Sequence, residues 1–189
     1  MDKKSKIILI AGSTASGKSN FAIQLAKKVN GEIINSDSMQ IYKEIKILNA
    51  RPISKNIKKI THHLYGFHSV KKNFSTGQWL KKTIRLIKEI KKKNKIPILV
   101  GGTGLYFKAI TSGLTKIPLI PMKYRNKLRV EHKKIGQKKF FNKLVKLDPL
   151  AKSRINDNDA QRTLRAYEVK KYTKTSMFKW HESTPKKFE

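Results

Sequence analysis

Eight consecutive residues near the start of the chain have the types and the spacing of a phosphate-binding loop. They run Gly12-Ser13-Thr14-Ala15-Ser16-Gly17-Lys18-Ser19 and match the pattern G-x-x-x-x-G-K-[S/T]. The glycines allow the backbone to curl, so that successive N–H groups of the loop and of the following helix face a phosphate. Lys18 is expected to neutralise phosphate oxygens, and the Ser19 hydroxyl is expected to hold Mg²⁺. The motif therefore predicts a site for a phosphate- or nucleotide-bearing ligand.

A carboxylate and a hydroxyl follow two later apolar runs that we expect to be strands. Asp37 comes directly after Glu32–Ser36, and Thr103 lies in the glycine turn that follows Ile96–Val100. That later run has no acid at its end, unlike the metal-binding strand of motor ATPases and GTPases. Because the carboxyl ends of parallel strands meet at one sheet edge, Asp37 is expected beside the loop, where it can take a proton from an acceptor. Two simpler interpretations remain open: Asp37 caps the next turn, and the glycine turn around Thr103 serves backbone geometry alone.

Patterns of apolar residues predict the strands and helices that position these groups. Ile7–Ala11 is an unbroken apolar run, which predicts a strand buried on both faces. Phe21, Leu25 and Val29 have helical spacing, and Gly31 is expected to end that helix. Strand, helix and strand in this order form a βαβ unit and imply a parallel sheet. Further patterns predict an amphipathic helix with Leu80, Ile84, Ile87 and Ile90 on its apolar face and a short helix over Leu105–Thr111.

The chain changes character after Gly113, where helical patterns begin to dominate. Asn158 or Asp159 is expected to cap one of these helices. We therefore predict an α/β fold, with a P-loop NTPase-like parallel sheet flanked by helices over residues 1–117 and a helical region over residues 118–189. Residues 41–77 show few regular periods. The large aromatic residues expected in the core are Trp79, Phe140 and Phe141.

The composition is strongly basic, with 44 Lys and Arg residues against 12 Asp and Glu residues and a formal net charge of +32. Such an excess attracts polyanions and predicts salt-sensitive binding to nucleic acid. Charge alone does not distinguish RNA from DNA or an anionic membrane, and a compositional bias could also spread lysine over every surface. The absence of cysteine excludes disulfides and thiolate metal sites and fits a reducing cytosol. No run approaches the roughly 18 apolar residues of a membrane span, so we expect no membrane contact. We also expect the protein to be cytoplasmic and a monomer.

Several motifs, taken in order along the chain, resemble the tRNA dimethylallyltransferases (isopentenyl-diphosphate:tRNA transferases). That family has a loop Gly-Pro-Thr-Ala-Ser-Gly-Lys-[Thr/Ser], in which Ser13 here replaces the proline. The other matching motifs are Asp37-Ser38-Met39-Gln40-Ile41-Tyr42, His62-His63-Leu64, Ile96 to Tyr106, Asn158-Asp159-Ala160-Gln161-Arg162, and Arg165 to Val169. Residues 44–49 depart from the family's Gly-x-Asp-Ile-Gly-Thr stretch. The resemblance covers nearly the whole chain and is far more specific than the loop alone.

The resemblance implies transfer of a dimethylallyl group from dimethylallyl diphosphate to N6 of adenosine 37 in tRNAs that read codons beginning with U. It implies Mg²⁺ as the cofactor and the tRNA anticodon stem-loop as the partner. Lys18, the loop and Mg²⁺ at Ser19 would stabilise the leaving diphosphate. Asp37 would accept the N6 proton, and Thr103 would help to fix the base or the prenyl donor. The residues implied to contact tRNA are Asp37, Ser38, Met39, Gln40, Thr103, Arg125, Gln161, Arg162, Thr163, Leu164 and Arg165.

Other classes of function share parts of this pattern. A small-molecule or nucleoside kinase would share the loop and Asp37 but should use ATP and a lid of basic residues. An inactive RNA-binding remnant is the non-enzyme alternative. Members of the family are considerably longer, so the chain is either a fragment or a form that has lost their C-terminal part. His62 and His63 invite a metal interpretation, but neighbours on a strand point to opposite faces, so a structural role is expected. Without the resemblance, Arg162 and Arg165 would be interpreted as a solvated helix face.

Overall fold

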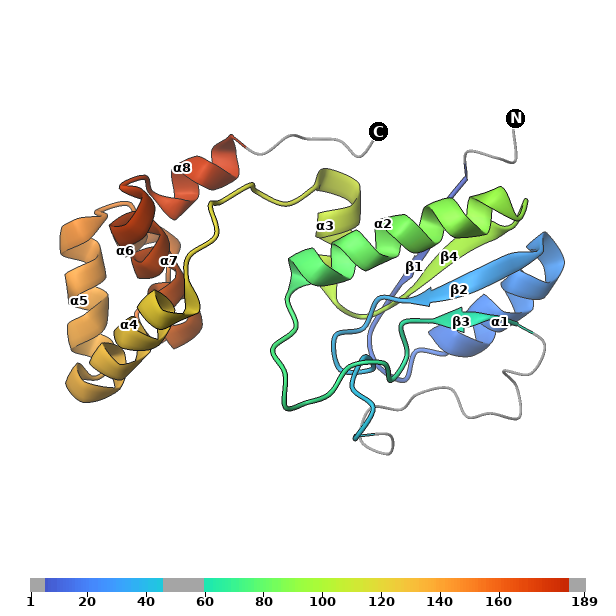
Figure 1. The fold of residues 1–189 in the computed structure, drawn as a ribbon, viewed down its shortest axis with the longest axis horizontal. Coiled ribbons are helices and arrows are strands. Elements are labelled where there is room, and N and C mark those ends of the chain that lie inside the picture. The colour runs from blue at the N-terminus through green and yellow to red at the C-terminus, as the bar shows by residue number, and fades with distance from the viewer. Residues whose placement is uncertain (1–5, 46–59, 184–189) are drawn as a thin grey trace. The chain divides into compact units, whose positions relative to one another are not determined.

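The computed structural model describes residues 6–45 and 60–183, and the chain divides into two compact units between Gly113 and Leu114 (Figure 1). The predicted boundary between residues 117 and 118 lies in a segment without helix or strand. Parts of the departing stretch 44–49 and of the helical region 118–189 lie outside the described residues. None of the described helices is long and apolar enough to cross a membrane.

The first unit contains a parallel four-stranded sheet, as the βαβ pattern predicts. Its strands, in the spatial order β1-β4-β2-β3, are β1 (Ile8–Ala11), β4 (Ile96–Gly101), β2 (Gly31–Asn35) and β3 (His62–His63). The sheet and its flanking helices confirm the predicted fold class. Apolar periodicity gave no sign of the two-residue strand β3, which lies in the stretch 41–77, although His62 and His63 were treated as neighbours on a strand.

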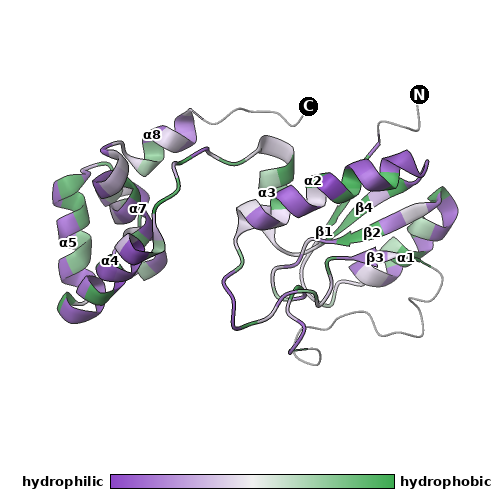
Figure 2. Ribbon diagram, in the orientation of Figure 1, coloured by the Kyte–Doolittle hydropathy of each residue, from purple (hydrophilic) through white to green (hydrophobic). Residues whose placement is uncertain are grey.

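Helices cover both faces of this sheet. Helix α1 (Lys18–Val29) packs on one face, while α2 (Thr76–Lys92) and α3 (Gly104–Ser112) pack on the other (Figure 1). Side chains alternate along the strands: Ile33 and Ile98 enter the cluster under α1, and Leu99 enters the cluster under α2 and α3. Figure 2 shows β1 and β4 as hydrophobic, and α2 with alternating hydrophilic and hydrophobic bands.

Strand β1 differs from the prediction that it is buried on both faces. Its residues alternate between half-buried and exposed, and Leu9 is 40% exposed. The cause is its position, because within the described residues β1 is paired only with β4 and forms an edge of the sheet. The strands buried on both faces are β2 and β4, which lie in the interior of the sheet. An unbroken apolar run does not reveal where a strand stands in the order.

The end of α1 also differs from the prediction. Asn30, rather than Gly31, takes the left-handed conformation at the helix end, with φ of 53°. Gly31 is instead the first residue of β2, where an added Cβ would lie 2.7 Å from Cδ1 of Ile98 and 2.9 Å from the carbonyl of Ile96. The glycine is therefore required by the close approach of β2 to β4 and not by the helix end.

Helix α2 begins at a capping box. The amide of Gln78 donates to Oγ of Ser75 at 3.2 Å, and the amide of Ser75 donates to Oε1 of Gln78 at 2.9 Å. Trp79 follows in the first turn, is fully buried and stacks on Tyr106 at a centroid distance of 4.1 Å. Its indole Nε1 donates to the carbonyl of Asn35 at 2.9 Å, so the predicted core tryptophan also braces the end of β2.

The second unit is a cluster of helices with its own core. They are α4 (Met122–Ile135), α5 (Gln137–Leu147), α6 (Ala151–Arg154), α7 (Ala160–Thr173) and α8 (Met177–Glu182). Phe140 and Phe141 are buried in this core, as predicted. Of the two predicted caps it is Asp159 that caps α7, since its Oδ1 accepts from the amide of Arg162 at 2.9 Å.

Candidate active site

The predicted phosphate loop connects β1 to α1. Its backbone takes left-handed conformations at Ala15 (φ 63°) and Gly17 (φ 78°), which curl the chain into the start of the helix. Gly17 is the N-cap of α1 and supplies no side chain to cap the helix, and the first turn of α1 contains no acid. The free amides at this end, together with the helix dipole, favour an anion.

Lys18 folds back over this loop. Its Nζ contacts the carbonyl of Ser13 and lies 3.5 Å from Oγ of Ser16. The ammonium charge is therefore held beside the loop amides rather than extended into solvent. Both features favour the same negatively charged ligand.

Asn35 fixes the turn that carries Asp37. Its Oδ1 accepts from the amide of Asp37 at 2.9 Å, and its Nδ2 donates to the carbonyls of Asp37 and Leu64, each at 3.0 Å. Asp37 also accepts at Oδ1 from the amide of Met39 at 2.8 Å, so it does cap the turn, as the simpler interpretation proposed. Among the described residues nothing donates to its other oxygen, Oδ2. One carboxylate oxygen thus orients the side chain, and the other is available for chemistry.

Thr103 ties the turn after β4 to the turn after β2. Its Oγ1 accepts from the amide of Ser38 at 2.9 Å and donates to Oγ of Ser38 at 3.2 Å. The two turns pass so closely that a Cβ on Gly101 would lie 2.2 Å from the carbonyl carbon and oxygen of Ser36. Glycine is therefore required at this position, and Thr103 acts on the Asp37 turn through Ser38.

A single pocket of about 280 Å³ brings the loop and Asp37 together. Its walls are formed by Thr14, Ala15, Ser16, Gly17, Lys18, Ser19, Asn20, Asp37, Gln40, Tyr65, Val100 and Gly101. The remaining predicted site residues in this unit do not line the pocket but lie within two positions of a lining residue in the chain: Gly12, Ser13, Ser38, Met39 and Thr103.

Tyr65 is a pocket residue that the sequence did not suggest. Burial, and secondarily the charge of Asp37, raises the pKa of the Tyr65 phenol above its ordinary value. The phenol therefore stays protonated near neutral pH and can donate a hydrogen bond. The only signal in the sequence is its position, directly after His62-His63-Leu64.

The pocket offers few ligands to a metal ion. Ser19 supplies the hydroxyl oxygen that the loop motif predicts as a donor to Mg²⁺. The described residues contain no group of three or more His, Cys, Asp or Glu side chains that could hold a metal. Mg²⁺ is commonly bound by one or two protein oxygens together with phosphate oxygens and water. The Ser19 hydroxyl therefore fits a Mg²⁺ ion that enters with a phosphate ligand.

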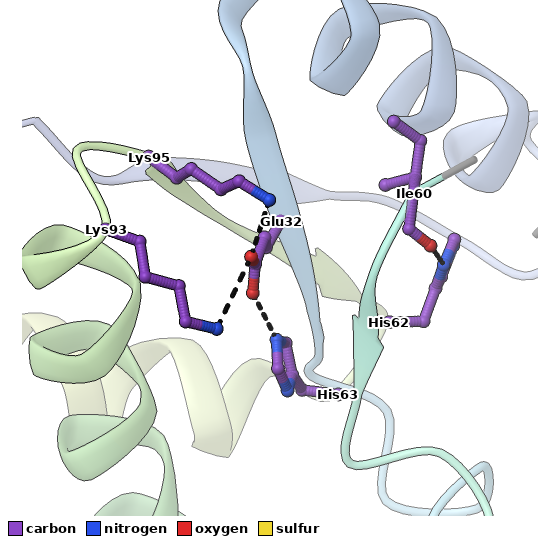
Figure 3. Close-up of polar contacts among 6 residues, drawn as sticks. All are labelled: Glu32, Ile60, His62, His63, Lys93 and Lys95. Carbon is purple, nitrogen blue, oxygen red and sulfur yellow. Dashed lines mark hydrogen bonds and ion pairs between the residues drawn. The ribbon is translucent and has the colours of Figure 1, made fainter.

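The two adjacent histidines point away from each other (Figure 3). Nδ1 of His62 lies 2.7 Å from the carbonyl of Ile60, and burial lowers the pKa of His62. Nε2 of His63 lies 2.7 Å from Oε2 of Glu32. The opposite orientations agree with the strand geometry expected for neighbouring residues.

Glu32 is a buried carboxylate surrounded by cations (Figure 3). Lys95 donates to its Oε1 at 2.9 Å, and Lys93 lies 3.7 Å from the same oxygen. Burial raises the pKa of Glu32, but the hydrogen bonds from Lys95 and His63 and the charges of both lysines outweigh it, so that the pKa is lowered. This cluster joins β2, β3 and the residues after α2, and it contains no residue of the pocket.

The remaining residues that the resemblance links to tRNA lie in the second unit. Gln161 and Arg162 are exposed in the first turn of α7. Thr163 is fully buried and accepts from Nε2 of Gln137 at 3.1 Å, while Leu164 packs against the core. Arg125 on α4 and Arg165 on α7 are both half-buried and lie beside the same carboxylate, that of Glu168.

Comparison with known proteins agrees with the motifs. A model of the IPP transferase family matches residues 40–189. A tRNA dimethylallyltransferase of Pelagibacter ubique is 61% identical over 188 residues, which is 100% of this chain and 60% of that protein. The corresponding protein of Rickettsia canadensis is 49% identical over 95% of this chain and 55% of its own length. The chain thus spans a little over half of these curated relatives.

Solved structures give the same result. A eukaryotic dimethylallyltransferase described as acting on tRNA superposes with a TM-score of 0.80 at 29% identity, over 97% of this chain and 46% of that one. A tRNA isopentenylpyrophosphate transferase of Bacillus halodurans superposes with a TM-score of 0.58 at 34% identity, over 91% of this chain and 57% of that one. The resemblance inferred from the motifs is confirmed.

Proposed function

This chain belongs to the IPP transferase family, and we propose that it transfers a dimethylallyl group from dimethylallyl diphosphate to N6 of adenosine 37 in tRNAs that read codons beginning with U. The product is N6-(dimethylallyl)adenosine in the tRNA. The names of its curated relatives support prenyl transfer to tRNA as the general reaction. The position of the adenosine and the choice of tRNAs follow from the resemblance of the motifs.

One observation carries this proposal. The phosphate loop and Asp37 line the same pocket. A diphosphate on the loop would therefore have a carboxylate beside its reacting carbon. A prenyl transferase needs an anion site for its leaving group and a base for its acceptor, and the pocket contains both.

The loop acts on the leaving group. When the allylic C–O bond breaks, its electron pair stays on the diphosphate, and negative charge grows on the diphosphate oxygens. The amides at the start of α1 and the ammonium group of Lys18 stabilise that charge. A Mg²⁺ ion held by Ser19 and the phosphate oxygens would supply further positive charge to the diphosphate.

Asp37 acts on the acceptor. The N6 nitrogen of adenosine forms the new bond to the allylic carbon and must lose a proton. Oδ2 of Asp37 accepts a hydrogen bond from the N6 amine and then takes that proton. Oδ1 remains bound to the amide of Met39, which keeps the carboxylate oriented.

The residues behind this carboxylate hold it in place. Asn35 fixes the backbone on both sides of Asp37, and Thr103 fixes Ser38, the next residue. The adenosine must leave the stack of the anticodon loop before it can enter the pocket, as bases do in other base-modifying enzymes. The RNA backbone is contacted by Arg125, Arg162 and Arg165, and the free energy of these contacts offsets part of the cost of unstacking.

A labelling experiment separates this function from the alternatives. The chain is incubated with an anticodon stem-loop RNA and free nucleosides, and with either dimethylallyl diphosphate labelled in the prenyl group or ATP labelled in its γ-phosphate. We expect label in the RNA from the prenyl donor only. Label passing from ATP to a nucleoside would identify a kinase. RNA binding without any transfer, also in a version lengthened to the size of the curated relatives, would identify an RNA-binding remnant.

A further inference from the structure

Helix α7 carries a glutamate in a position where a charge is costly. Glu168 is only 2% exposed and lies in the second half of α7, between the buried core residues Tyr167 and Val169 in the chain. The chain has only 12 acidic residues against 44 basic ones. A buried carboxylate is tolerated only when it is paired and hydrogen-bonded. The role of the Glu168 carboxylate therefore follows from the side chains that pair with it.

Two arginines from different helices meet on one oxygen of this carboxylate. Nε of Arg125, on α4, donates to Oε2 of Glu168 at 3.0 Å. Nη1 of Arg165, one turn earlier on α7, lies 3.5 Å from the same Oε2. The side chains of these arginines are 31% and 39% exposed, so each is anchored to Glu168 and remains partly open to solvent.

We propose that Glu168 is a positioning residue for tRNA binding, which holds Arg125 and Arg165 together and pre-orders them for the phosphates of the RNA backbone. The proposal rests on the proposed function, in which these two arginines contact tRNA. Glu168 itself is too buried to touch the RNA.

The geometry holds the arginines without cancelling their charge. Two positive charges share one negative charge, so the group keeps a net charge of about +1. Arg125 donates from Nε to Glu168, and its Nη1 donates weakly to the sulfur of Met122 at 3.9 Å. The other N–H groups of its terminal nitrogens make no further hydrogen bond among the described residues. A guanidinium group has five donors, and a phosphate needs only two of them for a bidentate contact.

Arg162 provides the contrast. It pairs with Asp159 at 3.1 Å, but its side chain is 73% exposed and that of Asp159 is 28% exposed. Such a surface pair orders a side chain weakly. An arginine held on a buried carboxylate loses less conformational freedom when RNA binds, because much of that freedom was lost on folding. Pre-ordering therefore belongs to Arg125 and Arg165 and not to Arg162.

Two variants with the same change in net charge, but with different expected effects on RNA binding, test the proposal. Glu168→Gln and Glu131→Gln each raise the net charge by one, and each removes an acid that is paired to a basic side chain, Lys143 in the case of Glu131. We expect Glu168→Gln to weaken binding of an anticodon stem-loop RNA about tenfold at fixed salt, although the protein becomes more basic. Glu131→Gln should leave binding unchanged or slightly tighter. Equal tightening in both variants would overturn the proposal.

A mutant cycle separates positioning from a structural role. Glu168→Gln should have little further effect on RNA binding when Arg125 and Arg165 are both already alanine, because it acts through them. An equal loss in both backgrounds, at a temperature where circular dichroism shows all variants folded, would mean that Glu168 only stabilises the fold. If the double alanine variant binds RNA as well as the parent, the RNA contacts of the proposed function fail instead. Should Glu168→Gln not fold, Glu168→Asp, which keeps the charge but shortens the reach, takes its place in the same cycle.

Discussion

Lys18 is the residue on which the phosphate site depends most directly, because its ammonium group lies over the loop. Lys18→Ala should weaken binding of dimethylallyl diphosphate by about 1.5–3 kcal/mol, the usual value of a charge-assisted hydrogen bond. Isothermal titration calorimetry with the diphosphate measures this loss. Lys27→Ala, in the last turn of the same helix, removes an equal charge and should bind like the parent. Equal affinity in the Lys18 and Lys27 variants would remove the assignment of the loop.

Thr103 is expected to affect the rate and not the binding of the donor. Thr103→Val deletes both hydrogen bonds to Ser38 and so loosens the turn that carries Asp37. Since Thr103 does not line the pocket, donor affinity should be unchanged, while the single-turnover rate should fall about tenfold. Thr103→Ser keeps the hydroxyl and should stay near the parent rate. A larger change in donor affinity than in rate would mean that Thr103 contacts the donor directly.

The site was predictable from the sequence where its chemistry is local, and not where it depends on contacts between distant segments. The loop is a continuous motif, and Asp37 follows a recognisable strand. Asn35 and Tyr65 gave no such signal. Asn35 acts by bonding Leu64, 29 residues away, and Tyr65 reaches the pocket from a stretch without periodicity. Glu168 is similar, because its partner Arg125 is 43 residues away.

At the scale of elements, the cluster around Glu32 joins β2, β3 and the segment after α2. The pKa of the Glu32 carboxyl is lowered in the folded protein from its ordinary value of 4.5. The stability that Glu32 contributes is therefore complete above pH 4.5 and is lost as the pH falls through its lower folded-state pKa. We expect Glu32→Gln to reduce the free energy of unfolding by about 1–3 kcal/mol at neutral pH. The same variant should show less acid destabilisation than the parent. Urea unfolding at about pH 7 and about pH 3 measures both effects.

Glu89→Gln is the matched control for this prediction. It removes the same charge from the end of α2, but its pair with Arg85 is exposed, with side chains 45% and 83% accessible. Exposed pairs of this kind contribute little, so Glu89→Gln should unfold like the parent at both pH values. An equal loss of stability in the two variants would show that net charge, and not the buried cluster, is responsible.

The elements themselves were predicted well where apolar periodicity is strong. The core strands, α1 and α2 follow from it. The errors have a common cause, since β1 as an edge strand, Gly31 as a contact between strands and the short strand β3 are all determined by which segments pair. Pairing is a property of the whole sheet, and one segment of sequence does not contain it.

At the scale of the whole molecule, the net charge of +32 has two explanations, binding to RNA and a compositional bias toward lysine. Binding of an anticodon stem-loop RNA should weaken steeply with salt, because phosphate contacts release counterions. Arg162→Ala should lower the slope of log K against log salt by about one unit, the value for one phosphate contact. Arg85→Ala, which removes an exposed charge from α2 of the first unit, should leave the slope unchanged. A parent slope near zero would make the charge irrelevant to RNA binding.

The most direct test of the account is the effect of Asp37→Asn on the separate steps of the reaction. The substitution keeps one acceptor oxygen but removes the basicity of the carboxylate. Calorimetry with dimethylallyl diphosphate and single-turnover prenyl transfer to the RNA are measured on the 189-residue chain and on a version lengthened to the size of its curated relatives. If only the lengthened version is active, Asp37 is judged there. We expect an unchanged donor affinity and a rate about 10² to 10⁴ lower, the range for loss of a positioned base. A rate equal to that of the parent would contradict it, because Asp37 would then be no more than the cap of its turn.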